Sequence, residues 1–349
     1  MSSRPYEIIV LGATGWTATI CAEHIARAFP INTKWSIAGR SAAKLEALRQ
    51  SLRIINPDRL EPTVHIVSQL DAQSLDPLVK AANVIINGVG PYHRYATPVV
   101  EACARNGTHY ADFSTEKLWI SEMIRDYHEL AVSSGATIIP SISGPSAPSD
   151  LAAWLIVSYL GRHGLPAASE VICSGEMTML GMRGGSLHTV LDVAENYGVR
   201  GWLTVDTYIS VVLIHIISKI GILFLAVPWF RSFFRTKSFS PGDGPDRTES
   251  RKTESAEWKA VGYVTGVAEP VAFSRFAFQG ALVDMAAILA VEAVATINDK
   301  LKFKDSNQVK ASLSTPSTLG QTFVDRLRTT GFTIEIEGSR NADQMAGTL

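Results

Sequence analysis

Short apolar runs and amphipathic stretches alternate along the first 144 residues of this 349-residue chain. The apolar runs are rich in Val and Ile and several end in Gly, which is typical of buried strands. In the stretches between them, apolar positions recur every three or four residues, which is typical of helices. This alternation predicts a Rossmann-type, doubly wound parallel α/β sheet over residues 1–145. Strands are expected near residues 6–11, 34–40, 63–71, 83–91, 108–114 and 136–144.

Beyond this point the regular alternation stops. Residues 147–161 predict a helix that Ser149 or Asp150 would cap, and later apolar runs predict strands, a hairpin and further helices. The polar stretch 240–259 contains Gly and Pro and predicts an exposed loop. We therefore expect a second α/β (α+β) domain over residues 146–349, and we assign substrate binding to it.

Residues 207–237 form the most apolar part of the chain. Residues 207–230 contain one Lys and one His among 24 residues, and a helix of that length would reach about 36 Å. Lys219 near its middle opposes simple insertion into a bilayer. Aromatic and cationic side chains are mixed over residues 229–237, which suits the headgroup layer of a membrane. We predict a membrane-associating segment, with a true span and a buried core helix as the alternatives.

Composition narrows the compartment and the partners. The net charge is −1 and charged residues make up 19% of the chain, so no basic field attracts nucleic acid. Cys21, Cys103 and Cys173 are far apart and have neither metal-ligand nor disulfide spacing. We predict no metal, no signal peptide, and an intracellular location at the cytoplasmic face of a membrane or at a lipid droplet.

The first strand runs into a glycine pattern, Gly12-x-x-Gly15-x-x-Ala18, that opens the first helix. Gly12 allows a tight turn, and Gly15 lets backbone N–H groups approach a pyrophosphate at the positive end of the helix dipole. An incidental tight turn is the alternative. The position at the first strand-to-helix turn favours a dinucleotide site. The residues predicted to contact the cofactor here are Gly12, Ala13, Thr14, Gly15, Trp16 and Thr17.

The tip of the second strand selects the nucleotide. NAD sites usually place a carboxylate there for the ribose 2′-hydroxyl, but this chain reads Gly39-Arg40-Ser41. Arg40 can bind a 2′-phosphate with two N–H groups, and Ser41 and Lys44 can add a hydroxyl and a charge. NADP(H) is therefore predicted. Asp71, after the third strand, either caps a helix or contacts the adenine edge.

The fourth strand ends in Asn87-Gly88-Val89-Gly90, followed by Pro91. Ligands of doubly wound sheets bind where the strand order reverses, and the fourth strand lies next to that point. We expect Asn87, Gly88, Val89 and Gly90 to bring backbone close to the nicotinamide ribose. An ordinary glycine-rich turn is the alternative.

These motifs give the chain a family resemblance. The stretches GATGWTA, AGRSAAKLEAL, INGVGPYHRYATPVVEACARNGTHYADFSTE, PSDLAAWLIV, RGGSLHTVLDVAE, PGDGPD and STPSTLGQTFVDRLRTTGFTIEI resemble the saccharopine dehydrogenase-like oxidoreductases, in the branch of the trans-acting enoyl reductases. The resemblance implies NADP(H)-dependent reduction, an α/β substrate domain and a lipid-surface habit. It also implies that the C-terminal helix, residues 318–331, packs back on the first domain.

One loop departs from the family pattern. The family usually reads Gly-Phe-Asp-Ser-x-Pro-Ser-Asp where this chain reads GPSAPSD over residues 144–150. One position is missing, and the Phe and Asp of the pattern have no counterpart. Because this loop begins the substrate domain, we expect substrate choice, or activity itself, to differ from that of the relatives.

Two tyrosines are the candidate catalytic groups. Reduction of an enoyl group needs a hydride on the β-carbon and a proton on the α-carbon. Tyr92, beside His93 and Arg94, lies closest to the predicted nicotinamide site. Tyr110, with Asp112 at the end of the fifth strand, is the second candidate. A packed ring with a satisfied hydroxyl is the structural alternative for both.

Three functions remain open. The first is an NADPH-dependent reductase of an apolar, α,β-unsaturated (enoyl) lipid, polyketide or terpenoid. The second is a saccharopine-type reductase of a C=N bond, which would need cationic groups for substrate carboxylates; residues 146–230 carry few. The third is a non-catalytic NADP(H)-binding protein of a lipid surface. The predicted partners are a hydrophobic small molecule and a membrane or lipid surface, with a homodimer left open.

Overall fold

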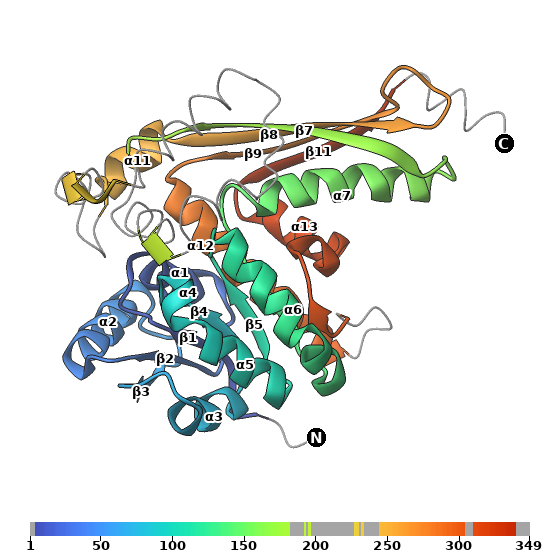
Figure 1. Cartoon of the computed structure of the whole chain (residues 1–349). Coiled ribbons are helices and arrows are strands. Elements are labelled where there is room, and N and C mark those ends of the chain that lie inside the picture. Colours follow the sequence, from blue (N-terminus) through green and yellow to red (C-terminus); the bar gives the residue numbers. More distant parts are fainter. Residues whose placement is uncertain are drawn as a thin grey trace.

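The computed structural model describes residues 4–181, 192, 195–196, 227–229, 232–233, 244–303 and 310–339. Two sheets organise these residues, a parallel one in the lower half of Figure 1 and an antiparallel one above it. The predicted Rossmann-type sheet is confirmed, and the second domain is built on the antiparallel sheet.

The parallel sheet has seven strands in the order β10-β6-β5-β4-β1-β2-β3. The order reverses between β1 and β4, whose residues pair from Tyr6 with Ala82 to Leu11 with Asn87. Both strands are almost fully buried, which explains their unbroken apolar runs. The strands are β1 Tyr6–Leu11, β2 Trp35–Gly39, β3 Thr63–Ile66, β4 Ala82–Asn87, β5 His109–Asp112, β6 Thr137–Ile139 and β10 Ser312–Leu313.

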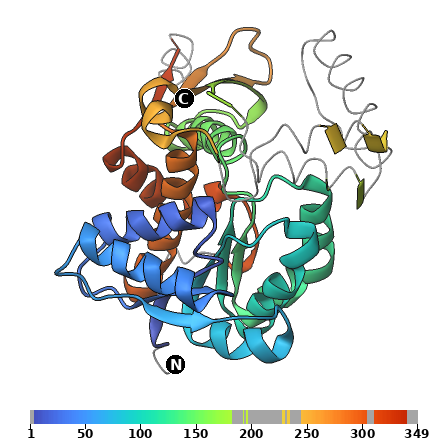
Figure 2. The same cartoon turned by 90° about the vertical axis from the view of Figure 1, so that its left-hand side faces the viewer.

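Helices cover both faces of this sheet (Figure 2). One face is covered by α1 Trp16–Ala28, α2 Ala42–Ile55 and α12 Leu282–Phe303. The other is covered by α3 Ala72–Lys80, α4 Tyr92–Tyr95, α5 Thr97–Asn106 and α6 Lys117–Ser134. Their apolar residues follow the helical period, as in α2, where Leu45, Leu48 and Leu52 are buried. The side-chain oxygen of Ser41 caps this helix by accepting the N–H of Lys44 at 3.4 Å.

The antiparallel sheet has four strands in the order β11-β9-β8-β7. Helix α7, Ala147–Arg162, lies along one face of it (Figure 1). Buried residues alternate along β8. Trp258 and every second residue on either side of it face the core, and the residues between them face outward. The predicted hairpin is confirmed as β8 and β9. The strands are β7 Ala168–Thr178, β8 Ser255–Val264, β9 Ala272–Gln279 and β11 Phe332–Gly338.

The chain returns from the second sheet to the first domain. Helix α12 packs on α1, and β10 extends the parallel sheet beside β6. Both follow residue 145, so the first domain also includes segments beyond the predicted division at residues 145 and 146. Within the predicted helix 318–331, the structure has the end of the 3₁₀ helix η1, Pro316–Leu319, and then α13, Gln321–Thr329. Helix α13 packs on α12, where Arg326 binds Glu292 at 2.8 Å.

Two local predictions are wrong. Neither Ser149 nor Asp150 caps α7, because the helix begins at Ala147 and both residues lie in its first turn; the carboxylate of Asp150 accepts the backbone N–H of Ser317 at 2.7 Å. The predicted loop 240–259 contains a helix, α11 Arg247–Thr253, capped by Asp246. Arg247 of this helix binds Asp284 at 2.7 Å, so a tertiary ion pair stabilises a stretch whose composition favours a loop.

The predicted membrane-associating segment 207–237 lies outside the described residues, except for 227–229 and 232–233. Among the helices that the structure does describe, none combines the length and the apolar character needed to cross a bilayer.

Candidate functional site

The turn from β1 into α1 is built to receive an anion. Gly12 has a φ of +71°, and its N–H donates to the carbonyl of Ala38 at 2.8 Å. Gly15 occupies the N-cap position of α1 without a side-chain cap, and the first turn contains no acidic residue. The first-turn N–H groups of α1 thus meet no competing carboxylate from their own helix, and the helix dipole favours a phosphate there.

Close packing explains the glycines of this turn. A Cβ atom on Gly12 would lie 2.7 Å from Cγ2 of Val89, and one on Gly88 would lie 2.6 Å from Cβ of Ala18. The turn after β1 and the loop after β4 therefore touch through glycine backbone. Such contact is what a dinucleotide cradle requires, because larger side chains would separate the two loops.

The other residues predicted at this turn differ in exposure. Ala13 is buried, so only its backbone faces the turn, whereas Thr14 is exposed. Thr17 and Trp16 are half-buried, and Trp16 packs against the core. Nε1 of Trp16 is buried and has no hydrogen-bond acceptor among the described residues. A bound dinucleotide could supply that acceptor, so the residues present fit the cofactor.

At the tip of β2, the predicted cationic side chains face solvent. Gly39 is buried within the strand, whereas Arg40 and Lys44 are exposed and no carboxylate occurs among residues 40–44. Asp71 caps α3 by accepting the N–H of Ser74 at 2.8 Å, and this hydrogen bond lowers the pKa of its carboxyl group. The capping alternative for Asp71 is therefore the one observed.

The loop after β4 continues into α4 through a cis peptide bond between Gly90 and Pro91. The side chain of Tyr92 is buried, packs on Trp119, and donates its hydroxyl to the carbonyl of Asn87 at 3.3 Å. Burial raises the pKa of Tyr92 well above its ordinary value, and the charge of Asp112 adds to this effect. Tyr92 therefore keeps its proton at neutral pH.

Tyr110 is enclosed more completely. Its hydroxyl donates to Oδ2 of Asp112 at 2.6 Å and accepts a hydrogen bond from Nδ2 of Asn87 at 3.1 Å. All three side chains are fully buried. Burial raises the pKa of Asp112, while hydrogen bonds from Tyr110 and from backbone N–H groups act in the opposite direction. This geometry favours a positioning role for Tyr110; its predicted catalytic role remains a prediction.

Glu116 is a buried carboxylate that the sequence analysis missed. It accepts the backbone N–H groups of Tyr92 and His93, each at 2.8 Å, and contacts Nδ1 of His93 at 2.6 Å. It thereby holds the start of α4 against the segment that precedes α6. One sequence signal could have found it: Glu116 lies four residues after Asp112, behind a buried strand, where an isolated acid needs partners.

Serines join the segment after β6 to the loop at residues 144–150 that departs from the family pattern. Ser141, at the end of β6, has a φ of 63° and donates its N–H to Oδ1 of Asp112 at 2.7 Å. The hydroxyl of Ser146 lies 2.9 Å from that of Ser141 and 2.7 Å from that of Ser143. The loop after β6 is therefore joined to the same carboxylate as β5, at the edge where the predicted site residues gather.

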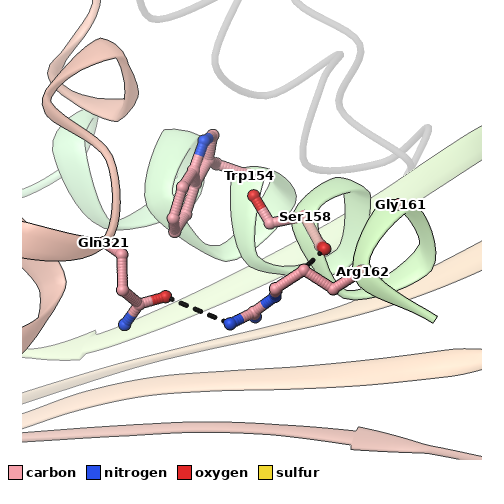
Figure 3. A pocket seen from close by; sticks show the side chains of 5 residues that line it. All are labelled: Trp154, Ser158, Gly161, Arg162 and Gln321. Atoms are coloured by element: carbon pink, nitrogen blue, oxygen red, sulfur yellow. Dashed lines mark hydrogen bonds between the residues drawn. The ribbon is translucent and has the colours of Figure 1, made fainter. Parts of the chain in front are cut away.

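A groove lies apart from these residues, between α7 and α13 (Figure 3). It has a volume of about 320 Å³ and is lined by Trp154, Ser158, Gly161, Arg162 and Gln321. Arg162 reaches across it to Oε1 of Gln321 at 3.5 Å. None of the predicted cofactor residues lines this groove, so it is not part of the cofactor cradle.

The structure joins a Rossmann-like parallel-sheet domain, which carries the predicted dinucleotide cradle, to a second domain built on an antiparallel sheet. Comparison with known families specifies it further: residues 8–139 match the saccharopine dehydrogenase NADP binding domain. The match covers less than half of the chain and indicates that NADP(H) is the cofactor of this domain.

Similar proteins extend the comparison. A trans-acting enoyl reductase of Mycobacterium ulcerans (strain Agy99) is 36% identical over 150 residues, 43% of this chain and 35% of the relative. A trans-acting enoyl reductase of Mycobacterium tuberculosis (strain ATCC 25618 / H37Rv) is 31% identical over 178 residues, 51% of this chain and 41% of the relative. The chain thus aligns with less than half the length of these relatives.

One solved structure resembles nearly the whole chain. Saccharopine dehydrogenase (L-Glu forming) from Saccharomyces cerevisiae aligns with 96% of this chain and 100% of its own, with a TM-score of 0.55 and 11% identity. At that identity, the likeness concerns the fold. It supports the arrangement of a parallel-sheet domain followed by an antiparallel one.

Proposed function

We propose that the protein is an NADPH-dependent reductase of an apolar, α,β-unsaturated (enoyl) substrate of the lipid, polyketide or terpenoid type. The observation that carries the proposal is a match to an NADP binding domain in a chain that is 31–36% identical, over 150–178 of its residues, to proteins named trans-acting enoyl reductase. The cradle combines an uncapped helix N-terminus at Gly15, closely packed glycine loops and a strand tip without a carboxylate.

Bound NADPH would supply the hydride for the β-carbon. We assign the proton for the α-carbon to Tyr92 because its hydroxyl lies at the Asn87–Gly90 loop; burial raises the pKa of this hydroxyl, so it would donate only to a strongly basic carbon such as that of an enolate. Its hydrogen bond to the carbonyl of Asn87 is long, at 3.3 Å, so the hydroxyl can turn to another acceptor. Tyr110 is less suited to this step, because its hydroxyl is committed to Asp112 at 2.6 Å.

The direct test is an assay of NADPH oxidation with a medium-chain trans-2-enoyl thioester. We expect the absorbance of NADPH to fall and the saturated thioester to appear in the mass spectrum. Tyr92→Phe should lower kcat while NADPH affinity is kept. Oxidation of saccharopine by NADP⁺, with no enoyl turnover, would favour the alternative C=N chemistry. NADPH binding without turnover of either substrate would favour the non-catalytic alternative.

We also propose that residues 207–237 attach the protein to a lipid surface at the cytoplasmic face of a membrane or on a lipid droplet. Two aromatic side chains of this segment, Trp229 and Phe233, are 69% and 51% exposed. Exposed aromatics beside arginines suit a headgroup layer. The protein should float with liposomes, and W229S/F233S should float less. Equal flotation of both proteins would oppose this proposal.

A further inference from the structure

A single chain of hydrogen bonds connects the loop after β4 with the ends of β5 and β6. The backbone N–H of Val89 donates to Oδ1 of Asn87 at 3.0 Å, and Nδ2 of Asn87 donates to Tyr110 at 3.1 Å. Tyr110 donates to Oδ2 of Asp112 at 2.6 Å. The other oxygen of Asp112, Oδ1, accepts the N–H groups of Ser114 at 2.9 Å and Ser141 at 2.7 Å.

Every bond in this chain points toward Asp112. The backbone N–H groups of Ser114 and Ser141 can only donate, so Oδ1 of Asp112 accepts them, and Oδ2 accepts the hydroxyl of Tyr110. The phenol oxygen then accepts from the amide N–H₂ of Asn87, which turns the amide oxygen toward Val89. Since the backbone N–H of Val89 can only donate, this is the one direction in which all the groups are satisfied.

We propose that Asp112 is a positioning residue whose acceptor oxygens set the direction of this chain and thereby hold the Asn87–Gly90 loop in the shape that receives the nicotinamide half of NADP(H). The inference rests on the proposed placement of nicotinamide against this loop. Asn87, Tyr110 and Asp112 are each 0% exposed, so water cannot replace a lost partner. A change at Asp112 therefore reaches Val89 through Tyr110 and Asn87.

Two isosteric substitutions test the direction. In D112N, Tyr110 would lie between two N–H₂ groups, and its own proton would have no acceptor. In N87D, Tyr110 would lie between two carboxylates, and its one proton could serve only one of them. In D112N/N87D every group regains a partner with the direction reversed: Asn at 112 donates to Tyr110, Tyr110 donates to Asp at 87, and that carboxylate still accepts from Val89.

The affinity for NADPH is measured by fluorescence titration without any enoyl substrate, so the test is independent of the reductase proposal. Each single variant should weaken NADPH binding about tenfold, because one buried polar group loses its partner. The double variant should return to within about threefold of the wild type. Adenosine 2′,5′-bisphosphate, which lacks nicotinamide, should bind all four proteins with similar affinity.

Asp126→Asn is the matched control, because Asp126 is an exposed carboxylate on α6. It should leave both affinities unchanged. A double variant that binds NADPH as weakly as the two losses combined, or that fails to fold, overturns the proposal. So does an equal loss of NADPH and of the bisphosphate in the single variants, which would indicate a general structural defect. Folding restored only in the double variant would support the reversed chain.

Discussion

The two ends of the predicted cofactor site are built in different ways. The adenine end, at the tip of β2, presents Arg40 and Lys44 as exposed side chains. The nicotinamide end, at the tips of β4, β5 and β6, is a buried network that includes Asp112 and Glu116. In the predicted site, the first end would offer charge to a phosphate, whereas the buried carboxylates of the second end accept backbone N–H groups.

The two ends should therefore respond differently to the substitution of a side chain. An exposed cation contributes through its own contact with the ligand, and its loss leaves the fold intact. A buried carboxylate is joined to several donors at once, and its loss leaves each donor unpaired in a low dielectric. Substitutions at the buried end should therefore change stability and affinity together, while those at the exposed end should change only cofactor preference.

The largest effect is expected for Glu116→Ala. It removes the acceptor of two backbone N–H groups, those of Tyr92 and His93, and a partner of the buried imidazole of His93. The free energy of unfolding should fall by about 3 kcal/mol, measured by urea denaturation. Glu101→Ala, at a half-exposed carboxylate on α5, should cost less than about 0.5 kcal/mol. Equal losses of unfolding free energy in the two variants would contradict the claim that the buried carboxylate is more important for stability than an exposed one.

The buried side of the comparison also predicts a pH dependence. His109 begins β5, the strand that ends at Asp112, and its Nδ1 accepts the N–H of Thr137 at 3.0 Å. Burial, with a contribution from the charge of Arg4, lowers the pKa of His109 from 6.5 to about 4. The folded state therefore holds a neutral imidazole that the unfolded state protonates more readily. Its contribution to stability is complete above pH 6.5 and is lost as pH falls toward 4.

The difference between these two pKa values corresponds to about 3 kcal/mol. His109→Asn keeps an acceptor for Thr137 and removes the titration. Relative to H109N, the wild type should lose about this much free energy of unfolding between pH 6.5 and 4. His128→Asn, at a partly exposed site on α6, is the control. Parallel curves for wild type and H109N would contradict the prediction.

The sequence predicts the exposed end better than the buried end, for a physical reason. Arg40 directly follows β2, so its place at the tip of the strand follows from its position in the chain, while its contact with the cofactor stays a prediction. The buried network depends on which strands are neighbours, and this is a property of the sheet order. The sequence does not show that the hydroxyl of Tyr110 lies between Asp112 and Asn87, and the role of Tyr110 as a proton donor stays a prediction.

The same limit applies to the fold. The alternation over residues 1–145 predicts the order of strands and helices, because each unit is local. Strand β10 has two residues and is defined by its pairing with β6, so no local sequence pattern predicts it. Helix α11 likewise depends on Arg247 and Asp284, which are distant in sequence.

Substitution of Gly12, in the turn after β1, tests the part of the predicted site between the two ends. Gly12→Ala would place a side chain at a φ of +71° and 2.7 Å from Val89, so the loop after β4 must move. We expect NADPH affinity to fall about tenfold to a hundredfold, since strain and displacement together cost about 1–3 kcal/mol. Gly135→Ala is matched, with a φ of +84° but no atom within 4 Å, and should leave the affinity unchanged. Equal affinities in the two variants would contradict the expectation, because a side chain at Gly12 would then leave NADPH binding undisturbed.

The smallest effect is the most selective. Arg40→Ala should raise the Kd for NADPH about tenfold, the equivalent of one charge-assisted contact, and leave the Kd for NADH unchanged. Arg40→Lys should fall between these values, because an ammonium group cannot form the two parallel hydrogen bonds of a guanidinium. Both affinities can be measured by fluorescence titration, with the unfolding midpoint as the check on stability.

Arg53→Ala, at an exposed arginine near the end of α2, is the control for the loss of one surface charge. If R40A and R53A reduce NADPH affinity alike, the preference for NADPH over NADH comes from the overall positive charge along α2. It would then not depend on a contact at the tip of β2. If R40A also lowers the unfolding midpoint as far as Glu116→Ala does, the two ends are not built differently. A selective loss of affinity for NADPH at an unchanged unfolding midpoint is the result expected for R40A. It would distinguish the adenine end, where exposed charges act singly, from the nicotinamide end, where buried groups form a network.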